Sequence, residues 1–257
     1  MYDMKKICLI QQEAGFGDIF FCQGISEYFS KEYDIIWPVA TQIFKTTKYL
    51  KTNSNINFVD NNSEFKYKEI FKALYESKQI SKLINKNNSE EILFLPLGYS
   101  SHMIHPLMKE IMQAKYRICG IDYKNWKQSF NFNRNIEKEN KLFYDILGLK
   151  DNEDYCLVNE QYVTQPDIHR KNLSKFYSTF GDTKFIQMQI YDEFTLFDWC
   201  KVFENMNSII TVDTSLMYIL EKLNLRNKTN FLCITRQPYT QNEIQELFEI
   251  PWRYIHA

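Results

Sequence analysis

The sequence has no long apolar run and no excess of charge of one sign. No segment approaches the roughly 18 consecutive apolar residues of a membrane-spanning helix, and the apolar run at 7–10 is too short for a secretory signal. The 31 Lys and Arg residues are balanced by 32 Asp and Glu residues, so no global basic field exists to attract nucleic acid or anionic lipid. We therefore expect a cytoplasmic protein with no membrane span and no nucleic-acid partner.

The cysteines form no paired motif. None of the six stands in a Cys-x-x-Cys pair, and four of them lie inside apolar, strand-like segments. This pattern predicts reduced core residues, not a disulfide framework or a zinc site, and we expect no metal and no cofactor. The four in apolar segments are Cys8, Cys119, Cys156 and Cys233.

The glycine signatures of the common nucleotide-binding folds are also missing. A dinucleotide fingerprint that begins at Gly15 and Gly17 would need a third glycine at the position of Phe20. No Gly-Lys-Ser/Thr follows, so the segment is not a P-loop either. A nucleotide site in this chain must therefore be built in another way.

What the sequence does contain is an alternation of strand-like and helical segments, within 257 residues that are 44% hydrophobic. Alternation of this kind predicts an α/β fold with mostly parallel sheets covered on both faces. The first half predicts strands at 6–10, 34–39, 57–59, 92–95 and 117–121, and helices near Asp18 and at 69–84 and 107–114. The second half predicts strands at 155–158, 185–189, 208–212 and 230–234, and helices at 141–147, 170–180, 196–204, 216–223 and 242–248.

The character of the sequence changes between the two halves, from alternating apolar segments to a polar stretch. Residues 123–140 are polar and without a steady period, and a charged turn follows at 150–153. We therefore place one domain at 1–140 and a second at 150–257, each Rossmann-like. We expect them to face each other across a cleft, with the C-terminal domain abbreviated.

Each half has one polar elbow between a strand and a helix. In the first, Gly15 and Gly17 allow a tight turn, and Asp18 stands at the helix start, at the carboxyl end of the first strand. A carboxylate there would repel a pyrophosphate, so the position favours accepting a proton or binding hydroxyl groups. The alternative is that Asp18 only caps the helix.

The second elbow lies in the segment 208–223, SIITVDTSLMYILEKL. A buried strand ends there at Asp213-Thr214-Ser215, and a helix begins with Leu216. Free amide groups and the helix dipole make such a helix start suitable for an anionic group such as a phosphate. The alternative is again a capping role, here for Asp213.

These elbows carry a family resemblance. Gly17-Asp18 and the turn 213–216, together with the phrase Thr195-Leu196-Phe197-Asp198-Trp199 and the run from Asn205 to Thr214, resemble the heptosyltransferase-type (family 9) glycosyltransferases. The resemblance is strongest over 185–225 and weaker over 7–30. In the rest of the chain only the layout of the strands and helices is similar. It implies a GT-B arrangement of two Rossmann-like domains.

The resemblance also implies an activity. A hexosyl or heptosyl group would move from a nucleotide-sugar donor to a hydroxyl acceptor, such as a glycan, with inversion and without a metal. Asp18 would match the family's catalytic base, and the turn 213–215 would border the donor phosphates and sugar. The chain departs from the family at Ser215, where glycine is common, and at Tyr218, where histidine is common.

Further candidates follow from position in the sequence. Lys115, with Tyr116 and Arg117, either touches the acceptor or leads into a strand. The expected donor-site residues, besides those of the turn, are Leu216, the cations Arg170, Lys171 and Arg236, and Asn159 for the base or ribose. The expected acceptor-site residues are Glu13, Gly15, Gly17, His102 and His105.

Two other functions remain open at this point. The chain could be a catalytically inactive nucleotide-sugar or glycan-binding protein of the same fold, which the short second half and Tyr218 motivate. It could also be a non-hydrolysing nucleotide-sugar epimerase, which is another enzyme built from two Rossmann-like domains.

Overall fold

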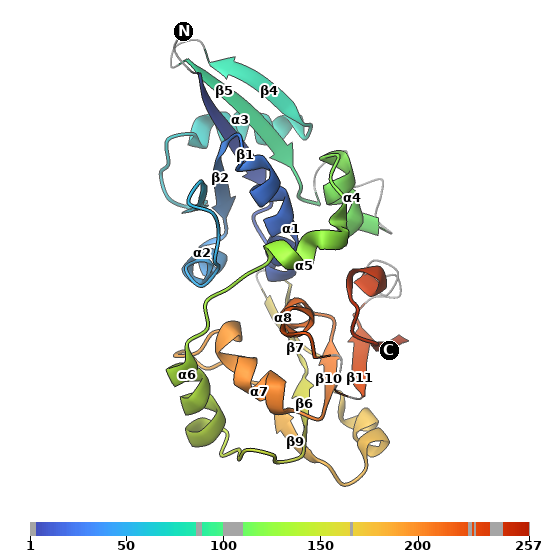
Figure 1. The fold of residues 1–257 in the computed structure, drawn as a ribbon. Coiled ribbons are helices and arrows are strands. Elements are labelled where there is room, and N and C mark those ends of the chain that lie inside the picture. Colours follow the sequence, from blue (N-terminus) through green and yellow to red (C-terminus); the bar gives the residue numbers. More distant parts are fainter. Residues whose placement is uncertain are drawn as a thin grey trace. The chain divides into compact units, whose positions relative to one another are not determined.

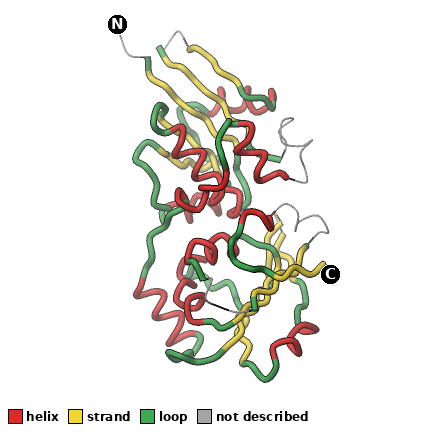
Figure 2. Tube along the Cα trace, turned by 45° about the vertical axis from the view of Figure 1, so that its right-hand side comes forward, coloured by secondary structure: helices red, strands yellow, loops and turns green. Residues whose placement is uncertain are grey.

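The computed structural model describes residues 4–85, 89–99, 110–164, 167–225, 228, 230–236 and 244–256. Its contacts divide the chain into two compact units, Met1–Asn131 and Phe132–Ala257. Both are α/β (Figure 1), and in Figure 2 the strands of each unit form a layer with helices beside it. No helix within the described ranges is long and apolar enough to cross a bilayer.

The sheet of the first unit has five strands in the order β3-β2-β1-β5-β4. Neighbouring strands are parallel except at the edge, where β4 pairs with β5 in the antiparallel sense. The strands that follow β1 in the chain, β2 and β3, lie on one side of it, and β5 and β4 lie on the other. The topological switch point of the sheet is therefore between β1 and β5. The strands are β1 (Lys5–Gln11), β2 (Asp34–Val39), β3 (Ile56–Asp60), β4 (Ser81–Asn85) and β5 (Glu90–Pro96).

Alternate residues of the central strands are buried on opposite faces. On one face, Ile7 and Leu9 of β1 pack with Phe71 and Leu74, which come from helix α3. Figure 1 shows α1 on the other face of the sheet. The helices of this unit are α1 (Phe16–Phe29), α2 (Thr41–Thr47), α3 (Lys68–Ser77), α4 (Ile111–Ile118) and α5 (Trp126–Ser129), with a 3-10 turn at Tyr123–Asn125.

Two of the elements predicted for this unit have a different structure, and the helices α2 and α5 were not predicted. The helix predicted over 69–84 ends at Ser77, because Lys78 adopts a left-handed conformation with φ of 52°, and the rest pairs with β5 as the edge strand β4. The strand predicted over 117–121 is instead the end of α4, which turns at Gly120 with φ of 69°. Cys119 therefore caps a helix and does not lie in a strand.

The sheet of the second unit has five parallel strands in the order β12-β11-β10-β6-β9. Counted along the chain this is the order 2-1-3-4-5, the second common order of doubly wound folds, with its switch point between β6 and β10. The strands are β6 (Tyr155–Asn159), β9 (Lys184–Gln187), β10 (Ser208–Val212), β11 (Phe231–Thr235) and β12 (Arg253–His256).

The helices of the second unit are short. Arg134 links the helix that contains Glu139 to the helix that contains Glu204, because its guanidinium contacts Glu139 at 2.8 Å and Glu204 at 2.5 Å. These contacts tie residues 132–140 to the second unit, although the sequence-based boundary falls at 140. The elements are α6 (Ile136–Asn140), a π-helix η3 (Lys141–Ile146), α7 (Cys200–Asn205), α8 (Leu216–Leu223) and the 3-10 turns η4 (Ser174–Phe180), η5 (Leu196–Trp199) and η6 (Gln245–Leu247).

The second unit also departs from the predicted elements. The helix predicted over 170–180 is the shorter 3-10 helix η4, which begins at Ser174. It is preceded by an unpredicted hairpin of β7 (Gln161–Thr164) and β8 (Asp167–Arg170), so that Arg170 ends a strand. The strand β12 was not predicted. The second unit is therefore abbreviated in its helices and not in its sheet, because its sheet has as many strands as the sheet of the first unit.

Candidate functional site

The first polar elbow lies at the switch point of the first sheet. The backbone leaves β1 and turns at Gly15, where φ is 82°, and α1 begins with Phe16. Asp18 stands in the first turn of α1, and a Cβ atom added at Gly15 would collide with its Oδ2. Only glycine allows the carboxylate to lie this close to the backbone.

Asp18 does not act as the helix cap. Gly15 occupies the N-cap position, and the Asp18 carboxylate forms an ion pair with Lys115 of α4 through Oδ1. The Lys115 side chain is fully buried, whereas the Asp18 side chain is 14% exposed. The sequence analysis predicted that Lys115 either touches the acceptor or leads into a strand, because nothing in its local pattern shows that α4 brings it to α1.

Further contacts hold the Lys115 ammonium. Its Nζ donates to Gln12 Oε1 at 2.7 Å and lies 5.3 Å from the centre of the Tyr99 ring. Gln12 is itself fixed, since Trp37 Nε1 donates to its carbonyl oxygen at 2.9 Å and its own amide donates to Ala14 at 2.6 Å. The cation and the carboxylate therefore belong to a connected polar cluster at the ends of β1 and β5.

Glu13 lies at the same edge of the sheet. Its Oε2 accepts a hydrogen bond from Asn61 at 3.0 Å, and its carbonyl oxygen accepts one from the amide of Ala40 at 2.8 Å. Partial burial raises the pKa of the Glu13 carboxyl above its ordinary value. Of the other expected acceptor residues, Gly15 and Gly17 belong to the elbow, whereas His102 and His105 lie outside the described residues.

Cys22 lies one turn further along α1 and is fully buried. Burial raises the pKa of its thiol to about 12, with Lys115 opposing this shift and Asp18 reinforcing it. The side chain therefore stays a neutral thiol near neutral pH. This agrees with its prediction as a core residue.

The second elbow lies at the switch point of the second sheet. Asp213 follows β10, and its side chain is 4% exposed. Arg236, just after β11, holds both carboxylate oxygens: its amide donates to Oδ1 at 2.6 Å, and its Nε lies 3.1 Å from Oδ2. Burial raises the pKa of Asp213, and Arg236 works against that shift.

The capping role predicted as an alternative for Asp213 is wrong. The N-cap of α8 is Ser215, and no side chain makes a capping hydrogen bond there. The carboxylate turns to Arg236 because that residue supplies both an amide and a guanidinium at the end of the neighbouring strand. The first amide groups of α8 are thus left without a side-chain acceptor, which is the arrangement that suits a bound anion.

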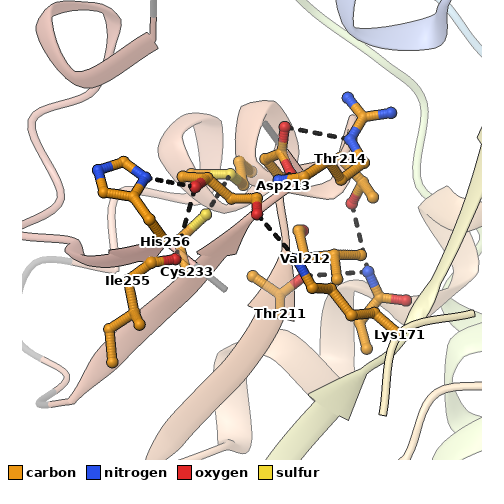
Figure 3. A network of polar contacts seen from close by, with 12 residues as sticks. Lys171, Thr211, Val212, Asp213, Thr214, Cys233, Ile255 and His256 are labelled. Carbon is orange, nitrogen blue, oxygen red and sulfur yellow. Dashed lines mark hydrogen bonds and ion pairs between the residues drawn. The ribbon is translucent and has the colours of Figure 1, made fainter. Parts of the chain in front are cut away.

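Two further side chains, those of Asn159 and Lys171, make contacts at the ends of β6, β10 and β11. Figure 3 labels Lys171 together with Thr211, Asp213 and Thr214. Asn159 donates to the hydroxyls of Thr211 and Thr214 at 3.0 and 3.3 Å, and so connects β6 to the elbow. Lys171 Nζ donates to the carbonyl oxygen of Thr235 at 3.0 Å. The structure therefore brings Asn159, Lys171 and Arg236 to the edge of the sheet that carries Asp213.

Arg170 has a different environment. Its guanidinium lies 2.7 Å from Glu160 Oε2, and Glu160 Oε1 accepts the amide of Leu173 at 2.9 Å. These contacts hold the β7–β8 hairpin on the end of β6. Arg236 also lies over the ring of Tyr162 in this hairpin, 5.3 Å from its centre.

Other residues of the resemblance are structural. Thr195 and Asp198 form a capping box that starts η5, with the Thr195 amide donating to Asp198 at 2.7 Å. Tyr218, where the family often has histidine, is buried and packs edge-on against Phe248 with ring centres 5.0 Å apart. Within the part of the chain that the structure describes, no three His, Cys, Asp or Glu residues cluster as metal ligands would.

Two doubly wound units in one chain, each with polar residues at its switch point, define the GT-B class of fold. No family model and no curated protein matches the chain. A solved family 9 glycosyl transferase from Veillonella parvula has a TM-score of 0.54 at 12% identity, with 99% of this chain and 86% of that one covered. The iron-containing dodecameric glycosyltransferase TibC from enterotoxigenic E. coli has a TM-score of 0.50 at 9% identity, with 99% and 66% covered.

These likenesses confirm the predicted fold class and the family resemblance at the level of the fold. The chain spans about two thirds of the length of TibC. With identities this low, the likeness concerns the path of the backbone and says nothing of substrates.

Proposed function

We propose that this protein is a metal-independent, inverting glycosyltransferase that moves a sugar from a nucleotide-sugar donor to a hydroxyl group of an acceptor such as a glycan. The observation that carries the proposal is the position of Asp18, a partly exposed carboxylate at the switch point of the first sheet. Ligands of open α/β sheets bind at such points. The GT-B fold is consistent with the proposal, since the two solved structures that share it are named as glycosyltransferases.

In the proposed reaction Asp18 is the general base. The carboxylate takes the proton of the acceptor hydroxyl as the oxygen attacks the anomeric carbon from the side opposite the leaving group. The new carbon–oxygen bond forms while the bond to the nucleoside diphosphate breaks, and its electron pair leaves with the phosphate. A positioned base typically contributes 10²–10⁴-fold to such a step.

The second unit is the proposed donor domain. The amides at the start of α8, from Thr214 to Leu216, face the donor phosphates, and Lys171 and Arg236 supply positive charge at the same edge. Preorganised amides and cations stabilise the charge that develops on a leaving diphosphate without needing a metal. Asn159 is the proposed contact to the base or ribose.

The first unit is the proposed acceptor domain. Glu13 and the elbow glycines Gly15 and Gly17 border Asp18 and would meet the acceptor hydroxyls. Arg170 is a further donor candidate, and its guanidinium is paired with Glu160 as that of Arg236 is paired with Asp213. We further propose a cytoplasmic location, where nucleotide sugars are available.

The test is sugar transfer by the parent and by Asp18→Asn, over a panel of nucleotide sugars and acceptors. The substitution keeps size and hydrogen bonding but removes the base, so we expect transfer to fall about 10²–10⁴-fold. Asp34→Asn is the matched control, since Asp34 begins β2 at the opposite end of the sheet and pairs only at the surface with Lys5, at 3.1 Å. Transfer by Asp18→Asn at the parent rate would refute the assignment.

A second candidate is a nucleotide-sugar-binding protein without transfer activity. The burial of Tyr218 against Phe248 favours it, because the side chain at a family site position packs into the core. Calorimetric binding of a nucleotide sugar with no product on any acceptor would support this candidate. Conversion of the donor sugar in the absence of an acceptor would instead identify an epimerase.

A further inference from the structure

Lys115 is the least expected residue of the candidate site. A lysine ammonium is rarely fully buried, because leaving water costs several kcal/mol unless the charge is paired and its hydrogen bonds are satisfied. Here the Lys115 ammonium contacts one carboxylate, one side-chain amide oxygen and the face of one aromatic ring. All three partners lie at the ends of β1 and β5 or in the first turn of α1.

The contacts distinguish the two oxygens of Asp18. Lys115 binds Oδ1, whereas Oδ2 lies on the side of Gly15. The aspartate side chain has two torsions, so without such a contact its carboxylate would rotate among several orientations. The side chain of Gln12 binds the ammonium, and the carbonyl oxygen of Gln12 accepts a hydrogen bond from the indole of Trp37. The hydrogen bonds that hold the ammonium therefore extend to a core residue.

A structural role alone does not require this ion pair. The packing of α4 on α1 has its own contacts, since Tyr116 donates to the carbonyl oxygen of Phe21 at 2.5 Å and fills the space beside Gly24. Buried ion pairs can generally be replaced by apolar residues of similar volume without loss of stability. A charged residue at this place therefore calls for a reason other than stability.

We propose that Lys115 is a positioning residue: it binds Oδ1 of Asp18, fixes the orientation of the carboxylate, and so leaves Oδ2 directed toward the acceptor hydroxyl. This inference rests on the proposed function of Asp18 as base. The proton from the acceptor goes to Oδ2.

The experiment compares Lys115→Met with Lys66→Met. Lys66 pairs with the buried carboxylate of Glu90 at 2.6 Å, at the opposite end of β5, so it controls for the loss of a lysine–carboxylate ion pair away from the site, with a lysine that is itself exposed. We expect Lys115→Met to lower kcat about 100-fold, the loss typical of a catalytic group misplaced by about 1 Å, and to leave the KM for the donor within twofold. Lys66→Met should keep the parent kcat.

Two further variants make the result decisive. The double variant Asp18→Asn/Lys115→Met should be no slower than Asp18→Asn, because groups that act as one unit are not additive. If Lys115→Met does not fold, Gln12→Met tests the same support, and we expect it to lower kcat with the donor KM unchanged.

The outcomes separate the two proposals. If Asp18→Asn is inactive while Lys115→Met, or in its place Gln12→Met, keeps the parent kcat, the positioning role is wrong and the base assignment stands. Equal losses in Lys115→Met and Lys66→Met would also overturn the positioning role. If Asp18→Asn itself transfers sugar at the parent rate, the proposed role of Asp18 as the base is wrong, and the positioning role of Lys115 is wrong with it.

Discussion

At the scale of single residues, Gly15 and Asp18 depend on each other. The backbone at Gly15 has φ of 82°, and Asp18 Oδ2 occupies the space where a side chain would stand. Backbone geometry and the position of the carboxylate are therefore set together. A substitution at residue 15 should disturb both.

We predict that Gly15→Ala destabilises the fold more than Gly120→Ala. Both glycines have positive φ, 82° and 69°, which costs an L-residue about 1–2 kcal/mol. Only Gly15→Ala adds a collision, with the Asp18 carboxylate, so its total loss should reach about 2–4 kcal/mol. Urea unfolding of both variants measures the difference. Equal losses would show that the carboxylate moves aside at little cost.

Asp213 predicts a pH dependence. Burial raises its pKa above the ordinary value of 3.8, so between that value and the raised one the folded protein binds more protons than the unfolded chain. The free energy of unfolding then falls as pH rises through this interval. We expect the fall to be smaller in Asp213→Asn, as measured by urea unfolding at several pH values. A fall of the same size in both proteins would contradict the assignment.

At the scale of elements, α3 shows how periodicity becomes burial. Phe71 and Leu74 face the sheet and pack on β1 and β5, while Lys72 faces water and pairs with Glu69 at 2.8 Å. We predict that Leu74→Ala lowers the free energy of unfolding by about 2–5 kcal/mol. Lys72→Ala should change it by no more than about 0.5 kcal/mol. A small effect of Leu74→Ala would mean that the helix collapses onto the space left behind.

The same element shows where local pattern misleads. The apolar residues after Ser77 continue the helical spacing of α3, but Leu83 and Ile84 belong to the edge strand β4. Pairing with β5, and the ion pair of Lys82 with Glu91 at 2.9 Å, stabilise the strand instead. The choice depends on the neighbouring strand β5, which a local period does not report.

At the scale of the whole molecule, each unit has its own switch point and its own proposed ligand. A nucleoside diphosphate at 100 times its Kd should raise the free energy of unfolding of the unit that binds it by about 2.7 kcal/mol. We predict that Lys171→Met weakens this effect and that Asp18→Asn leaves it unchanged, because the proposed donor site lies in the second unit. Thermal-shift measurements on the three proteins test this. Loss of the effect in Asp18→Asn alone would place the nucleotide in the first unit.

We also predict that transfer does not depend on a metal. Positive charge from Lys171 and Arg236 and the amides of α8 are the proposed partners of the leaving diphosphate. Dialysis against a chelator should therefore leave kcat unchanged, and added Mg²⁺ or Mn²⁺ should not raise it. A chelator-sensitive rate that a metal restores would contradict the metal-free mechanism.

The sequence by itself determined the alternation of strands and helices, the two polar elbows and the class of fold, because apolar runs and turn residues act through the local backbone. It placed Asp18 and Asp213 after the strands β1 and β10, where the structure has them. It did not determine their partners. Lys115 is 97 residues from Asp18, and Arg236 is 23 from Asp213. Only the packing of distant elements decides which charges meet, so only the tertiary structure showed that both carboxylates pair with cations and cap no helix.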